Sequence, residues 1–154
     1  MGNARQDVAL LILRLSGIYL AWGHGVGKLQ RLASGEFGPF IEGVGKMGFP
    51  MPTAFAWAAA IAETAGFLVA VGLLTRIAAG LGAATMAVAA LLRHHAPAQF
   101  GSALGLTEVP AETLRGWGSP ELALVYFLCL VALVLLGPGR YSLDALIRRR
   151  RGAK

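Results

Sequence analysis

Four long runs of apolar residues leave this chain few ways to fold. They cover residues 8–27, 53–74, 76–92 and 121–136. About 20 apolar residues in a helix cross the hydrocarbon core of a bilayer, and only a helix satisfies the backbone polar groups within one such segment. The sequence therefore predicts an all-α integral membrane protein. We expect a single domain over residues 1–154 with four transmembrane helices in one bundle.

The composition supports lipid as the solvent of these helices. Hydrophobic residues make up 56% of the 154 residues and charged residues only 14%, whereas soluble domains carry about a quarter charged residues. A small domain has a high surface-to-volume ratio and could not hide so much apolar surface from water. The net charge is +6. Because the basic residues flank the apolar runs, the charge favours anionic lipid over nucleic acid as the partner.

The distribution of basic residues predicts the orientation. If the N-terminus lies in the cytoplasm, the cytoplasmic side holds Arg5, Arg76, Arg140, residues 148–151 and Lys154. The opposite side then holds Lys28, Arg31, Lys46, Arg93 and Arg115. Cytoplasmic loops carry the excess of Lys and Arg. We therefore expect a multi-pass protein of the cytoplasmic membrane with both termini in the cytoplasm.

The segments between and after the apolar runs differ in character. Residues 28–52 are rich in glycine and end in a Pro-containing break, so a loop is expected there. Residues 93–120 form a long connection with a short helix near 111–115. After the Gly-Pro-Gly of residues 137–139, Ser142 caps a further helix over about 142–150. Its apolar side chains oppose four arginines, which predicts an amphipathic helix on the inner membrane surface.

Two charged residues fall inside the apolar runs, and a charge at that depth suggests function by default. Arg14 lies in the first run and Glu63 lies near the middle of the second. At 1.5 Å per residue, a long arginine side chain spans the difference in depth, so we expect Arg14 and Glu63 to meet in the bundle. Two interpretations remain: an ion pair that only fixes helix register, or a polar floor beneath a ligand cavity.

A second polar group is expected at the outer rim of the bundle. His24 and Lys28 lie one turn apart, the pair His94 and His95 follows the third run, and Glu121 begins the fourth. Such a set could bind a quinone head group, exchange its protons, or hold a metal or haem. No H-x3-H or C-x-x-C spacing occurs, and Cys129 is the single cysteine. We assign no metal ligands, and a histidine cluster without a ligand stays open.

The order and spacing of several short motifs resemble the DoxX family of small bacterial membrane proteins. The resemblance is carried by Arg14, residues 24–29 (HGVGKL), residues 48–50 (GFP), Glu63, Gly66, residues 72–76 (GLLTR), His94, His95, Glu121 and residues 137–144 (GPGRYSLD). It implies four transmembrane helices in the bacterial inner membrane. It also implies a redox setting, because the family is related to a subunit of a thiosulfate:quinone oxidoreductase and has relatives linked to thiol metabolism.

Three hypotheses for function follow. The first is a membrane subunit of a quinone-linked oxidoreductase, in which His24, Lys28, His94 and His95 are catalytic and a partner redox protein supplies electrons. In that hypothesis Arg14, Glu63 and Glu121 bind the cofactor, with a quinone favoured over haem or metal. The second is a non-catalytic anchor for a partner enzyme. The third is a small transporter, which would need a homo-oligomer around a pore.

Overall fold

The computed structural model describes residues 3–152, and every regular element in that range is helical. The prediction of an all-α membrane protein is confirmed. The helices come in several long rods that are interrupted by short breaks. These breaks decide which polar side chains meet.

The first rod is longer than the sequence predicted. It consists of α1 (Ala4–Leu20), the π-helical segment η1 (Ala21–Val26) and α2 (Gly27–Ser34). The Asn3 side chain accepts a hydrogen bond from the N–H of Arg5 at its start, and Gly35 ends it with φ 77°. The prediction that this helix ends at about residue 27 is therefore wrong. Glycine alone does not stop a helix that is held by tertiary packing.

The expected loop at residues 28–52 is largely helical. Besides α2, it contains α3 (Gly38–Lys46). The apolar side chains of Phe37, which precedes α3, and of Ile41 and Val44 within it recur at helical spacing. The second rod follows as α4 (Pro52–Thr64) and α5 (Gly66–Val71), with a break at Ala65. Phe37 and Val44 are buried in a small core together with residues of α2 and α4.

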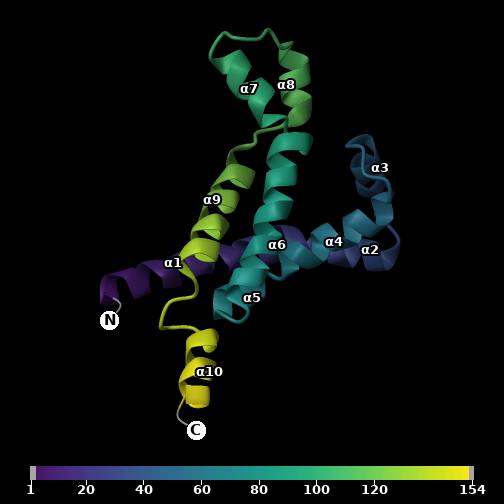
Figure 1. The fold of residues 1–154 in the computed structure, drawn as a ribbon. Helices are drawn as coiled ribbons and strands as arrows, with labels where there is room; N and C mark the ends of the chain where they lie inside the picture. The colour runs from purple at the N-terminus through teal and green to yellow at the C-terminus, as the bar shows by residue number, and fades with distance from the viewer. Residues whose placement is uncertain (1–2, 153–154) are drawn as a thin grey trace.

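The remaining helices form an up-and-down pair with a hairpin beyond it. The third rod is α6 (Thr75–Val88) with the π-helical segment η2 (Ala89–Arg93), and it is followed by α7 (Ala96–Ala103), α8 (Ala111–Trp117), α9 (Glu121–Leu136) and α10 (Leu143–Gly152). In Figure 1, α7 and α8 extend beyond the ends of α6 and α9, and α10 projects from the opposite end.

Within residues 3–152, three helices are long and apolar enough to span a membrane: Ala4–Ser34, Pro52–Val71 and Thr75–Arg93. A fourth span requires α8 and α9 to be taken together across a 45° bend. By itself α9 has 16 residues, or about 24 Å at 1.5 Å per residue, which falls short of a hydrocarbon core of about 30 Å. The chain is thus a membrane protein with three or four spanning helices.

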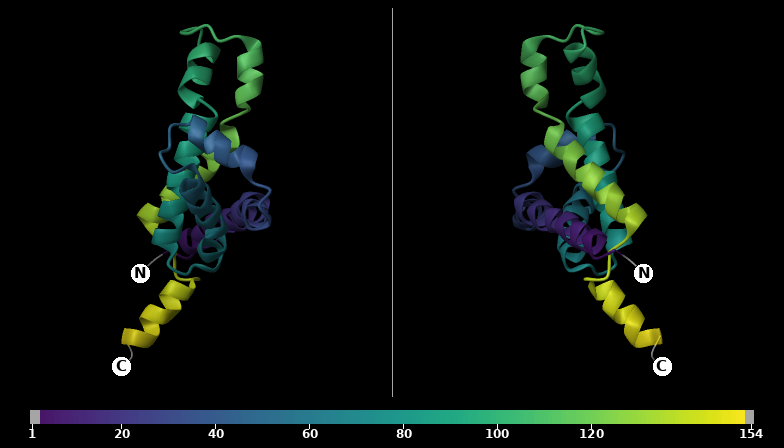
Figure 2. Two further views of the ribbon diagram at one scale, coloured as in Figure 1. Left: turned by 90° about the vertical axis from the view of Figure 1, so that its right-hand side faces the viewer. Right: turned by 90° about the vertical axis from the view of Figure 1, so that its left-hand side faces the viewer.

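The rods are arranged as two pairs that cross. One pair is α1 and η1 against α4 and α5, and the other is α6 against α9. The pairs run in clearly different directions in Figure 1, and the side views in Figure 2 look almost along α1 while α6 and α9 stay upright. The main core lies at the crossing, where Leu20, Val69, Leu130 and Leu133 are fully buried.

Candidate functional site

The buried carboxylate of Glu63 pairs with Lys28. Lys28 Nζ lies 2.5 Å from Glu63 Oε1, and the side chains are 26% and 1% exposed. The predicted contact between Arg14 and Glu63 is therefore wrong. Because the first rod continues through residue 28, Lys28 stays on the helix that faces α4. A Cβ on Gly25 would lie 2.5 Å from the N atom of Thr64, so the two backbones touch at this level.

Arg14 serves the opposite end of the molecule. Its side chain is 1% exposed, and Nη2 donates a hydrogen bond to the carbonyl oxygen of Tyr141. Among residues 3–152, its Nε and Nη1 have no hydrogen-bond partner. The segment that follows α9 folds back over this end of α1, as shown by the N–H of Arg140, which donates to Asp7 Oδ1 at 2.9 Å. Arg14 thus joins the C-terminal segment to the first rod. It does not line the cavity that holds the histidines.

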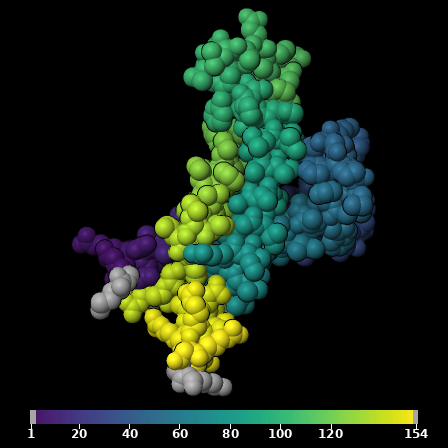
Figure 3. Space-filling view, viewed as in Figure 1, coloured from purple at the N-terminus to yellow at the C-terminus, as the bar shows by residue number. Residues whose placement is uncertain are grey.

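A cavity of about 1150 Å³ lies between the two crossed pairs of helices, on the side of α3. Figure 3 shows the notch between the column of α6 to α9 and the arm formed by α3 and α4. The walls are mainly apolar and come from η1, α2, α3, α4, α6, η2 and the first turns of α9. The polar side chains in the wall are those of His24, Lys28, Lys46, Glu63, Thr85, Arg93, His94, His95, Ser119 and Tyr126, and Trp117 also contributes.

The inner part of this cavity brings together four polar side chains. Lys28 and Glu63 form the ion pair, and Lys28 Nζ also lies 5.1 Å from the centroid of the Phe40 ring. His24 meets Tyr126 edge to face, with their ring centroids 6.1 Å apart. The first rod, the second rod and α9 therefore contribute polar side chains to one wall of the cavity, and α3 adds the Phe40 ring beside Lys28.

The two neighbouring histidines occupy the outer rim of the cavity. His94 Nδ1 lies 2.7 Å from the carbonyl oxygen of Trp117, and His95 packs against the Trp117 ring at 4.4 Å between centroids. The Gln99 amide donates to the carbonyl of His94 at 2.6 Å and so fixes the turn. His95 has φ 50°, a left-handed conformation that costs free energy in a non-glycine residue.

Both π-helical segments lie at this site. η1 contains His24, and η2 ends at Arg93 immediately before His94. A π-helical turn adds one residue to a helix and rotates the side chains that follow, and such turns are frequent at functional sites. Here the two turns aim His24 and the His94–His95 pair at the same cavity.

Two predicted site residues lie outside this group: Arg14, which contacts Tyr141, and Glu121. Glu121 is exposed at the start of α9 and is absent from the cavity wall. Within residues 3–152, no three His, Cys, Asp or Glu side chains come together in a geometry suited to a metal ion. The cavity thus unites five of the seven predicted residues: His24, Lys28, Glu63, His94 and His95.

Several residues of the wall were missed by the sequence analysis, and three of them shape the inner part of the cavity or its cover. Tyr126 places a hydroxyl group in the otherwise apolar α9, a signal that the sequence did contain. Phe40 and Phe49 belong to the segment that was expected to be a glycine-rich loop. The apolar spacing of α3 was the available sign that this segment folds over the bundle.

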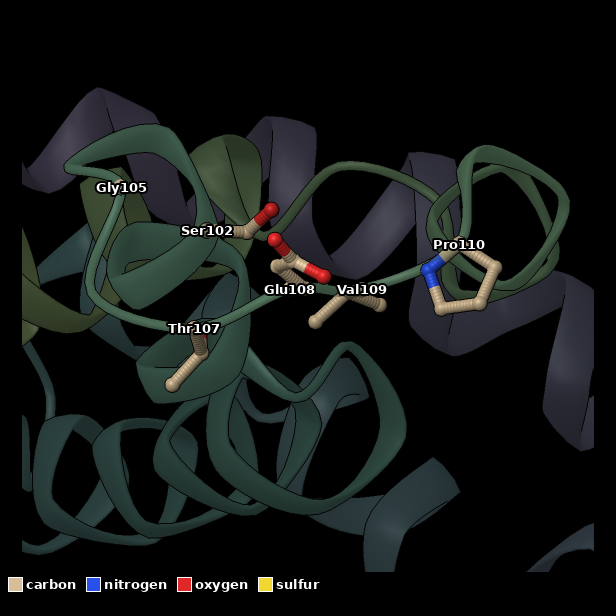
Figure 4. Close-up of a pocket in the computed structure, with 6 residues that line it drawn as sticks. All are labelled: Ser102, Gly105, Thr107, Glu108, Val109 and Pro110. Carbon is tan, nitrogen blue, oxygen red and sulfur yellow. The ribbon is translucent and has the colours of Figure 1, made fainter.

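A second depression, of about 580 Å³, lies at the tip of the α7–α8 hairpin. Figure 4 shows Ser102 and Glu108 pointing toward one another across it, with Thr107 and Pro110 at its edge. Most of the lining residues are exposed. It lacks the enclosure that small-molecule sites usually have, so the cavity between the crossed pairs is the candidate site.

The fold and the cavity define a multi-pass membrane protein with a ligand-sized apolar cavity whose polar wall lies between its helices. The family model named DoxX matches residues 9–95, more than half of the chain, and the chain belongs to the DoxX family. The predicted resemblance is thereby confirmed. The matched range includes His24, Lys28, Glu63 and both rim histidines. Comparison with the curated proteins and with the solved structures gives no match.

Proposed function

We propose that this DoxX-family protein is the membrane subunit of a quinone-linked redox system and that the cavity binds the quinone ring. The observation that carries the proposal is the cavity itself, whose wall is mainly apolar and whose inner part brings together the polar side chains of Lys28, Glu63, His24 and Tyr126. A quinone is a flat apolar ring with two carbonyl oxygens. Cavities that hold small ligands usually have volumes of about 300–1000 Å³, and this cavity, at about 1150 Å³, is slightly larger.

The residues of the polar wall suit the two ends of such a ring. Lys28 Nζ is partly exposed and is held in place by Glu63, so it has hydrogen bonds left to donate to a carbonyl oxygen. Imidazole exchanges protons near neutral pH, and His24 lies in the same wall. The rim histidines His94 and His95 lie toward the outer end, where protons would pass to water.

Electrons must come from another protein. A bound quinone accepts two electrons and two protons when it is reduced to the quinol. The chain has a single cysteine, Cys129, which cannot form a dithiol pair within one chain. A partner redox protein at the membrane surface is therefore part of the proposal, as are the bacterial inner membrane and cytoplasmic ends of the chain.

The proposal is tested by titrating the protein in lipid nanodiscs with a short-tailed quinone. Trp117 lines the cavity, so a quinone bound there should quench its fluorescence in a saturable manner. His24→Phe keeps a ring beside Tyr126 but loses the polar nitrogens, and we expect binding to weaken about tenfold, the effect of one hydrogen bond. Arg31 is exposed on α2, so the Arg31→Gln protein should bind the quinone with the same affinity as the unaltered protein.

Two outcomes would count against the proposal. Quenching that rises linearly with quinone concentration would show only partition into lipid. Equal binding by the His24→Phe and Arg31→Gln proteins would show that the polar wall takes no part.

The anchor hypothesis is favoured by one observation, the hairpin of α7 and α8. Phe100, Leu104 and Leu106 are 52%, 73% and 76% exposed at or near its tip, where a partner enzyme could cover them. An anchor without a site would keep the partner's activity when His24 and His94 are replaced by alanine. Loss of activity with retained partner binding would instead favour the quinone site.

A further inference from the structure

The start of α10 is clasped to the turn between α5 and α6. Asp144 Oδ1 accepts a hydrogen bond from the N–H of Leu74 at 2.9 Å, and Oδ2 accepts from the N–H and the hydroxyl of Thr75 at 3.0 and 2.9 Å. In return, the N–H of Asp144 donates to the carbonyl of Gly72 at 2.9 Å. We call these four hydrogen bonds the Asp144 clasp. They fix α10 to two spanning helices at once.

The position of the clasp places α10 at a membrane surface. The spans Pro52–Val71 and Thr75–Arg93 both end at the turn that carries the clasp. α9 ends at Leu136 on the same side, and only six residues separate it from α10. α10 therefore begins where the hydrocarbon core of the bilayer ends.

The side chains of α10 divide into an apolar face and a basic end. Leu143, Leu146 and Ile147 are 41%, 45% and 39% exposed, and their spacing of three and four residues puts them on one face. Ala145 packs against the bundle with 7% exposure. The four arginines at 148–151 are all exposed, and in the described part of the chain none of them is within ion-pair distance of a carboxylate.

We propose that α10 is a docking surface for anionic lipid headgroups, and that the Asp144 clasp transmits this binding to the stability of the helix bundle. The apolar face enters the boundary between headgroups and acyl chains, while the arginines contact lipid phosphates. The arginines and the apolar face lie on one short helix at the membrane boundary, a combination that fits a lipid surface better than an acidic protein. Since the clasp ties α10 to α5 and α6, lipid bound to α10 favours the folded bundle by mass action.

The first measurement reports where α10 lies. Leu146→Cys, made in a Cys129→Ser background and labelled with an environment-sensitive fluorophore, is placed in nanodiscs of phosphatidylcholine with or without phosphatidylglycerol. We expect a blue shift in the anionic discs that high salt reverses, because screening weakens contacts between exposed charges. A label that stays in a water-like environment in both lipids would overturn the proposal and favour a protein partner on this face.

The second measurement tests the coupling. Phosphatidylglycerol should raise the Tm of the unaltered protein by about 5 °C. Replacing arginines 148–151 with glutamine should abolish the rise, and replacing them with lysine should keep most of it. Asp144→Asn should keep the blue shift of the label but lose the rise in Tm. The proposal fails if the glutamine variant responds to the anionic lipid as the unaltered protein does, or if Asp144→Asn retains the full rise.

Discussion

The ion pair between Lys28 and Glu63 is the most informative contact at the scale of single residues. The carboxylate is almost fully buried while the ammonium group is partly exposed. Removing the lysine therefore strands a buried charge, whereas removing the glutamate leaves a cation that can still reach water. The two single changes should differ in cost even though they break the same contact.

We predict that Lys28→Met lowers the free energy of unfolding by about 3 kcal/mol and Glu63→Leu by about 1 kcal/mol. The double variant should recover part of the loss of Lys28→Met, because no charge then remains buried. Thermal unfolding of the three proteins in one detergent measures this. Simple additivity of the two single effects, or a larger loss for Glu63→Leu than for Lys28→Met, contradicts the account.

Asp144 gives a prediction on pH. Burial alone raises the pKa of Asp144, but hydrogen bonds from Thr75 and Leu74 and the charge of Arg148 outweigh it and hold the pKa below its ordinary value. A carboxylate with a lowered pKa in the folded state stabilises above its unfolded pKa, which is about 3.9. This stabilisation is lost as the pH falls through the folded pKa.

We therefore expect Asp144→Asn to lower stability by about 1 kcal/mol near neutral pH, a typical cost of losing a helix cap. The difference in Tm from the unaltered protein should shrink once the pH is below about 4. Glu42→Gln is the control, since Glu42 pairs with Lys46 at the surface and should change Tm little. A difference for Asp144→Asn that does not vary with pH would count against the clasp.

At this scale the sequence could indicate which residues are unusual but not all of their partners. Glu63 and Arg14 were both singled out, and both are buried. Their pairing was mispredicted because depth along separate helices does not fix which faces meet. Lys28 reaches Glu63 only because the first rod continues past residue 27, and Arg14 is taken up by the chain after α9.

At the scale of helices, close backbone contact decides how the first two rods pack. A Cβ on Gly17 would lie 2.3 Å from the carbonyl oxygen of Gly66, and one on Gly25 would lie 2.5 Å from the N atom of Thr64. Both distances are too short for any side chain. Small residues allow such an approach between membrane helices, and here the approach sets the level at which Lys28 meets Glu63.

We predict that Gly17→Ala and Gly25→Ala each lower stability by about 2 kcal/mol through overpacking. Gly23→Ala, in the same rod, is the matched control, because a Cβ there meets nothing within 4 Å. It should be neutral or slightly stabilising, since alanine favours helix more than glycine. Thermal unfolding tests the series, and equal Tm values for all three variants would contradict the packing.

At this scale the helix α3 could be predicted from the sequence, but the π-helical segments could not. The helicity of α3 was available from the spacing of Phe37, Ile41 and Val44. The π-helical segments η1 and η2 could not be predicted from the sequence, because one additional residue in a helical turn leaves no distinct pattern of apolar residues. These segments aim His24 and His94 at the cavity, so the site's geometry depends on the less predictable feature.

At the scale of the whole molecule, the orientation in the membrane is the first testable matter. Asp7 contacts the backbone of Arg140, so the start of the first rod lies at the same end as the chain that leads into α10. This arrangement agrees with the charge-based expectation that the two ends share one side. The sequence could not predict that the two helix pairs cross. Small residues, which allow close packing of helices, occur in both pairs and therefore do not indicate which helices pack together or at what angle.

Impermeant maleimide labelling of whole cells tests the orientation, with single cysteines in a Cys129→Ser background. We expect Ser34→Cys and Thr113→Cys to be labelled from outside, because α2 ends the first rod far from Ala4, α8 lies at the end opposite α10, and the basic residues predict that Ala4 and α10 are cytoplasmic. Ala4→Cys and Arg149→Cys should be labelled only after the cells are opened. Labelling of Ala4→Cys and Ser34→Cys from the same side would contradict the long first span.

The central claim is that the cavity between the crossed pairs holds a quinone. Ala59 lines the cavity on α4, while Ala54 on the same helix is exposed and outside it. The most direct measurement is a quinone titration in nanodiscs of the unaltered protein, Ala59→Phe and Ala54→Phe, each first shown to be folded by its Tm. The account predicts saturable binding by the unaltered protein and by Ala54→Phe, and none by Ala59→Phe. Unchanged binding by a folded Ala59→Phe protein would contradict it.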